Sequence, residues 1–121
     1  SEIEMPAASV TMFESGETTV MTGQLYGRLD GSSRTVLSGD GMSCEMEMAK
    51  QSDGSAAGVM NCTDANGQLV YSAAQSVTAE EYSMSMNGAM VTPTETPLGS
   101  GNVAFGWGNK ADPGYLLSLL N

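Results

Sequence analysis

The chain of 121 residues contains no histidine, two cysteines, and four lysine and arginine residues against fourteen aspartate and glutamate residues. Without histidine, and with both cysteines expected in a disulfide, the usual catalytic triads and zinc sites cannot form. The net charge of −10 leaves no basic patch that could neutralise a phosphate backbone. We therefore predict a non-enzymatic protein with no cofactor that binds neither nucleic acid nor an anionic membrane surface.

Large aliphatic residues are also scarce. Fewer than one residue in five is Leu, Ile, Val or Phe, which together with this charge approaches the composition of disordered chains. Ten Met residues, four Tyr and one Trp supply part of the missing apolar volume, and a covalent cross-link would lower the entropy of the unfolded state. We expect one small folded domain, residues 1–121, with a thin core.

Long hydrophobic runs are absent. No stretch approaches the roughly 20 consecutive apolar residues that a membrane-spanning helix needs. The sequence begins at Ser1 with neither an initiator Met nor an apolar leader, so we expect a mature or trimmed form. Together with a structural disulfide, this predicts an extracytoplasmic protein, whether periplasmic, lipid-anchored or secreted.

Short runs rich in Val, Thr, Tyr and Met recur at roughly 8–12-residue spacing between Gly, Asp, Asn and Ser, as is typical of antiparallel strands. The expected strands lie near residues 8–13, 18–29, 34–38, 42–51, 55–63, 68–76, 82–87 and 102–108. Consecutive hairpins predict a meander, and about eight short strands must close or stack to bury their apolar faces. We predict an all-β fold, a small antiparallel meander barrel, with a β-sandwich as the alternative.

Two segments fall outside this strand pattern. Residues 92–101 contain two Pro and two Gly residues, which interrupt β-ladders, so we expect a long loop there. The C-terminal tail, residues 114–121, is the most apolar stretch of the chain. Its leucines either pack on the same molecule, which we expect, or form a binding patch for a second copy or another partner. These leucines are Leu116, Leu117, Leu119 and Leu120.

The two cysteines are spaced for a disulfide within a hairpin. If Cys44 and Cys62 face each other across two strands, then Gln51 pairs with Ser55 around a three-residue loop. Gly54 supplies the left-handed conformation that the last loop position needs. A directly opposed, non-hydrogen-bonded pair has Cα atoms about 4.5 Å apart, within the range of a disulfide. Register and turn chemistry therefore predict this bridge independently.

Four features follow one another in the sequence around the cysteines. A Gly-bounded strand that contains Cys44 is followed by a turn, then by a Gly-x-x-x-Cys segment from Gly58 to Cys62, and then by an Asn66-Gly67 turn. In this pattern residues 37–70 resemble small secreted or lipoprotein-type β-barrel domains of proteobacteria, most of which have no assigned function. The resemblance implies a barrel-like fold and a cell-envelope location. It implies no functional residue.

Methionine alternates with other residues on two expected strands, 42–51 and 82–87, so that each set lines one face. Methionine commonly fills gaps in a core that is short of Leu and Ile. Thioethers are also soft ligands that select Cu(I). We expect these methionines and Met60 to be core residues and predict no metal. If the protein did bind copper, its ligands would be Met46, Met48, Met84 and Met86.

The carboxylates are mostly in expected turns. Asp30, Asp40 and Asp53 each precede Gly, where an Asp side chain accepts hydrogen bonds within its own turn. Asp64 begins a segment that resembles part of a calcium loop, but the twelfth position is Gln75 and not the bidentate Glu that such a loop needs. We interpret all four as turn residues.

These residues allow three functions. The first is a non-enzymatic binding or structural module, secreted or in the cell envelope, which contacts a protein or glycan partner through loops or the apolar tail. The second is a secreted enzyme inhibitor that inserts the loop at 93–101 into a cleft. The third is a periplasmic Cu(I)-binding protein.

Overall fold

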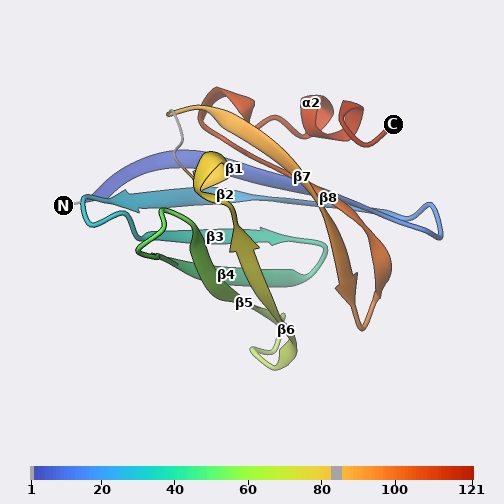
Figure 1. Cartoon of the computed structure of the whole chain (residues 1–121). Coiled ribbons are helices and arrows are strands. Elements are labelled where there is room, and N and C mark those ends of the chain that lie inside the picture. The colour runs from blue at the N-terminus through green and yellow to red at the C-terminus, as the bar shows by residue number, and fades with distance from the viewer. Residues whose placement is uncertain (1, 83–85) are drawn as a thin grey trace.

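In the computed structural model, residues 2–82 and 86–121 are described, and they form eight strands and three short helical segments (Figure 1). The strands are β1 (Glu2–Phe13), β2 (Thr18–Arg28), β3 (Ser33–Gly39), β4 (Met42–Lys50), β5 (Ala56–Asp64), β6 (Leu69–Val77), β7 (Gly88–Thr96) and β8 (Gly99–Trp107). The helical segments are α1 (Ala79–Tyr82), the 3₁₀ turn η1 (Gly108–Lys110) and α2 (Pro113–Ser118).

The strands form one antiparallel sheet in the order β6-β5-β4-β3-β2-β1-β8-β7. Sequence neighbours are hydrogen-bonded to each other except for β6 and β7, and β1 also pairs with β8. The sheet curls into a nearly closed meander barrel in which no ladder among the described residues joins β6 to β7 (Figure 1). We call this gap the seam. The predicted meander barrel is confirmed, and the sandwich alternative is wrong because there is a single sheet.

The period-2 alternation of the strands determines which side chains face the interior. On β4, Cys44 and Met48 are buried, whereas Glu45 and Glu47 between them are exposed. On the outer face, Arg34 Nη1 of β3 lies 3.4 Å from Glu45 Oε1. Sulfur therefore faces inward and charge faces outward, as predicted for this hairpin.

Two clusters of buried residues lie on opposite faces of β1. The inner cluster consists of Ala7, Met21, Leu37, Cys44 and Cys62. The outer cluster, where α2 covers β1 and β8 (Figure 1), consists of Ala8, Val10, Ala104 and Leu116. Residues 7–10 are consequently buried without interruption instead of alternating.

The segment 92–101, predicted as a loop, is instead the hairpin of β7 and β8. Strand pairing continues as far as Thr96 and Gly99, which leaves only residues 97 and 98 for the turn. Pro93 is tolerated because β7 is the last strand in the sheet order, and an edge strand can lack an N–H on its outer side.

The strand expected at 82–87 is also wrong. Tyr82 ends α1, residues 83–85 lie outside the described residues, and β7 begins only after them. A helix forms here because Thr78 and Glu81 make a capping box. The Thr78 N–H donates to Glu81 Oε1 at 2.9 Å, and the Glu81 N–H donates to Thr78 Oγ1 at 3.2 Å.

Candidate functional site

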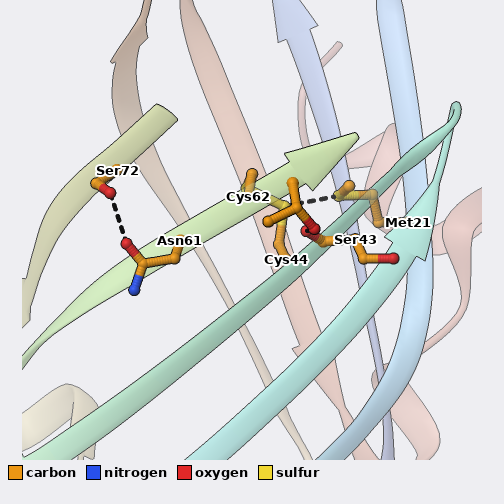
Figure 2. The surroundings of a disulfide bond; sticks show 7 residues. Met21, Ser43, Cys44, Asn61, Cys62 and Ser72 are labelled. Carbon is orange, nitrogen blue, oxygen red and sulfur yellow. Dashed lines mark hydrogen bonds between the residues drawn. A yellow bond between two sulfur atoms is a disulfide. The ribbon is translucent and has the colours of Figure 1, made fainter. Parts of the chain in front are cut away.

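The Cys44–Cys62 disulfide joins β4 and β5 in the predicted register (Figure 2). The two Cα atoms are 4.1 Å apart, and the same register places Met46 opposite Met60. Met21 Sδ lies 3.8 Å from Cys44 Sγ, a van der Waals contact because a disulfide sulfur carries no proton. The predicted bridge is confirmed, and it lies on the inner face of the barrel.

The turn between β4 and β5 has the predicted three-residue form. The Gln51 N–H donates to the Ser55 carbonyl at 2.7 Å, and Gly54 has a left-handed φ of +88°. Asp53 Oδ1 accepts from the Ser55 N–H at 2.9 Å. The hydrogen bonds from Ser55 also hold the pKa of Asp53 below its usual value. Asp53 is therefore a turn residue, as predicted.

The other three aspartates that were expected in turns also belong to turns. Asp30 Oδ1 accepts from the Ser32 N–H and Asp64 Oδ1 accepts from the Asn66 N–H, both at 2.9 Å. Asp40 instead adopts a left-handed φ of +54° at the turn between β3 and β4. Within the described part of the chain, no three His, Cys, Asp or Glu side chains gather into a group that could hold a metal ion.

The barrel interior contains a cavity of about 430 Å³. Thioether, aliphatic, aromatic and hydroxyl side chains line it, and none of the described residues in this lining is Asp, Glu, Lys or Arg. The whole chain has four basic and fourteen acidic residues. The cavity is therefore an uncharged chamber, of the size of small-molecule sites, inside a strongly acidic protein.

The side of the cavity that is farthest from the seam has large apolar side chains together with the hydroxyl groups of Thr19, Ser33 and Thr35. Strands β2 and β3 lie in the middle of the sheet order, so they face the seam across the barrel. The residues that we call the floor are Met21, Leu25 and Leu37. The residues that we call the methionine wall, on β4 and β5, are Met46, Met48 and Met60.

The cavity opens sideways through the seam. On β1, which has partners on both sides, alternate residues line the cavity: Ser9, Thr11 and Phe13. Consecutive residues line it at 74–77 on β6 and at 92–94 on β7. A side chain that points away from a barrel can border its interior only where the neighbouring strand is missing. This lining pattern therefore places an opening between β6 and β7.

Neutral hydrogen-bonding side chains lie on both margins of the seam. The four that we call the rim are Tyr71 and Gln75 on β6 and Thr92 and Thr94 on β7. None of the four makes a side-chain hydrogen bond to another described residue. Their donors and acceptors are consequently free to bind a molecule in the cavity.

Tyr82, the last residue of α1, ties this helix to the turn between β2 and β3. Its hydroxyl donates to the Gly31 carbonyl at 2.6 Å and lies 3.1 Å from Ser33 Oγ, from which it can accept. Both Tyr82 and Ser33 line the cavity. The helix that replaces the expected strand thus bounds the cavity at the end opposite the turn of β7 and β8.

The structure does not bring together the three candidate copper ligands that it describes. Met46 and Met48 line the cavity, but Met86 is 56% exposed and does not belong to the lining. The expectation that Met86 is a core residue is wrong, because β7 begins only at Gly88. Met84 lies outside the described residues.

The apolar tail packs on the same molecule chiefly through Leu116, whose side chain is fully buried against Ala8, Val10 and Ala104. Leu120 packs partly against the same cluster. The tail can fold back because Asp112 begins α2, and its Oδ1 accepts from the Gly114 N–H at 3.2 Å.

The other two leucines of the tail are more accessible. Leu117 is 37% exposed and Leu119 is 39% exposed. A binding role for them, including dimerisation, stays a prediction. No described helix, α2 included, is long and apolar enough to cross a membrane.

Burial at the rim predicts a pH effect. Desolvation raises the pKa of Tyr71 above the value near 10 of an exposed tyrosine. Between the unfolded and folded pKa values the unfolded chain binds fewer protons, so stability falls as pH rises through this window. We expect the free energy of unfolding of Tyr71→Phe, measured in urea from pH 8 to 12, to fall less steeply above pH 10. The same change at exposed Tyr115 is the control, and equal slopes for both variants would contradict the burial of the Tyr71 hydroxyl.

No family model matches this sequence, and no curated protein and no solved structure matches it either. The resemblance of residues 37–70 to envelope β-barrel domains therefore stays a prediction.

Proposed function

We propose that the protein is a non-enzymatic binding module whose barrel interior holds a small, uncharged and mainly apolar molecule. The observation that carries this proposal is the cavity of about 430 Å³ with no Asp, Glu, Lys or Arg among the described residues that line it. The interior of an eight-stranded barrel is either filled by side chains or holds one small ligand. Here the side chains leave room, and the seam offers a way in.

The chemistry of the lining supports binding over catalysis. The cavity presents several hydroxyl groups, but the chain has no His, and no carboxylate belongs to the described lining that could activate a hydroxyl. The cavity sulfurs are thioethers and a disulfide, neither of which is a nucleophilic thiolate. These groups can orient a ligand by hydrogen bonds and contacts.

The proposal includes an extracytoplasmic location. Its support is the Cys44–Cys62 bridge, because structural disulfides persist in oxidising compartments. A protein or glycan partner of the cell envelope stays a prediction. The inhibitor alternative has lost its specific support, because the loop that it required is a β-hairpin with a two-residue turn.

The proposal is tested with Nile red, a neutral dye whose fluorescence rises and shifts to the blue in apolar surroundings. We expect saturable binding at one site per chain. Thr19 of β2 lines the cavity, so Thr19→Phe fills part of it and should weaken dye binding by about tenfold or more. Thr22 lies on the same strand but is exposed on the outer face, so Thr22→Phe should leave binding unchanged.

Circular dichroism and urea unfolding of both variants show whether each is folded. Absence of saturable dye binding to the wild type would refute the proposal. Equal loss of binding in two folded variants would also refute it, because the dye would then lie on the surface and not inside the barrel.

A further inference from the structure

The polarity of the cavity lining is uneven. The rim at the seam has hydroxyl and amide groups, whereas the described lining residues of β4 and β5 are methionines and the disulfide-bonded Cys44. Strand order places rim and floor on opposite sides of the barrel. A molecule that fills this space meets free hydrogen-bonding groups at the rim and apolar groups along the methionine wall and the floor.

We infer, on the basis of the proposed function, that the ligand is a neutral amphiphile whose alcohol, ester or amide end lies at the rim and whose hydrocarbon part lies on the floor and the methionine wall. Flexible thioether side chains adapt to hydrocarbon chains of irregular shape. The rim hydroxyls of Tyr71, Thr92 and Thr94 can each donate to or accept from an uncharged polar group.

The charge distribution argues against an ionised end group. Arg28 and Arg34 are held on the outer face by Glu2 at 2.9 Å and Glu45 at 3.4 Å. Lys110 Nζ lies over the Tyr115 ring, next to α2 on the outside of the barrel. The fourth basic residue, Lys50, is exposed, and no Lys or Arg belongs to the described lining. A carboxylate or phosphate at the rim would therefore lose hydration without a cation to pair with, which is strongly unfavourable.

The seam also provides main-chain groups for a polar end. Strands β6 and β7 are the two ends of the sheet order, so their outer edges present N–H and C=O groups that no described strand pairs. A carbonyl or hydroxyl group at the seam can bind these groups in addition to the rim side chains. This favours a ligand with a compact polar end over a pure hydrocarbon.

The test measures displacement of bound Nile red by octan-1-ol, octane and octanoate, which share one chain length. The double variant Tyr71→Phe/Thr92→Val removes two rim hydroxyls with little change in shape. We expect it to raise the octanol concentration needed for half displacement by about five- to tenfold, the range of one net hydrogen bond, and to leave that of octane unchanged. For the wild type at pH 7, we expect the concentration needed for half displacement to be about a hundredfold higher for octanoate than for octanol.

The matched control is Tyr115→Phe/Thr22→Val, which makes the same chemical changes on the outer surface, where Tyr115 is 37% exposed. This control should leave the concentrations of octanol and octane needed for half displacement unchanged. If octane and octanol displace the dye equally from the wild type and the rim variant, the neutral amphiphile is wrong and the apolar binding module stands. Octanoate binding as tightly as octanol would overturn the uncharged end group. If the wild type shows no saturable binding of the dye itself, the proposed function fails.

Discussion

Replacing both Cys44 and Cys62 with alanine is expected to lower the free energy of unfolding by about 3 kcal/mol, because the bridge closes a loop across a sequence separation of 18 residues. Both side chains are buried, at 3% and 0% exposure, so the loss of packing adds to the loss of the cross-link. The total free energy of unfolding of a small domain is roughly 5–15 kcal/mol. Urea unfolding of the double variant, followed by fluorescence of Trp107, measures the change.

The control for this prediction is the neighbouring cross-strand pair. Ser43 lies opposite Thr63 on the outer face, and Ser43→Ala/Thr63→Ala should cost less than about 1 kcal/mol, as surface changes do. Titration of free thiols in denatured, unreduced wild type should find none. Two reactive thiols per chain would overturn both the bridge and the extracytoplasmic location that it supports.

Leu116→Ala is expected to lower the free energy of unfolding by about 2–5 kcal/mol, the range for a fully buried leucine. Leu116 is the residue of α2 that is buried, and it fills the space over Ala8, Val10 and Ala104. Since this cluster covers the outer face of β1 and β8, its loss exposes the ladder that joins these two strands. Thermal and urea unfolding would both report the change.

Leu117→Ala is the matched control, because its side chain is 37% exposed. It should cost less than about 1 kcal/mol. Size-exclusion chromatography of both variants and of a chain ending at residue 111 shows whether the tail also joins two molecules. Unchanged stability of Leu116→Ala together with loss of a dimer would show that the tail acts between molecules and not within one.

Much of the fold follows from local sequence signals. The turns at 52–54 and 66–67 and the alternation along β4 specify the central hairpins, because each has its own Gly, Asp and period-2 pattern. The disulfide could be predicted because Cys44 and Cys62 lie in the register that the turn imposes. Local signals are sufficient for these central hairpins, in which each strand pairs with both of its sequence neighbours.

The errors lie around β7, the edge strand that does not pair with the strand before it. Pro93 and Pro97 suggested a loop, yet Thr92, Thr94 and Thr96 alternate as strand residues do. Proline is tolerated there only because the sheet ends at β7, and this depends on the strand order of the whole sheet.

The candidate site was missed for a related reason. The rim residues Tyr71 and Thr92 belong to strands that are distant in sequence and meet only across the seam. The interpretation of Met46, Met48 and Met60 as core residues identified the inward face of the barrel. It did not show that this face leaves a space, because the volume depends on how far the curled sheet holds its strands apart.

The ladder between β1 and β8 has a consequence for how the chain folds. Ala7 pairs with Trp107, about 100 residues later, so one edge of β1 stays open until synthesis has passed Trp107. Contacts of such long sequence separation slow folding, and an open strand edge is a site for association with other chains. The late arrival of β8 and α2 therefore sets the period in which the nascent protein is most prone to aggregate, and a factor that shields the open edge of β1 would act in that period.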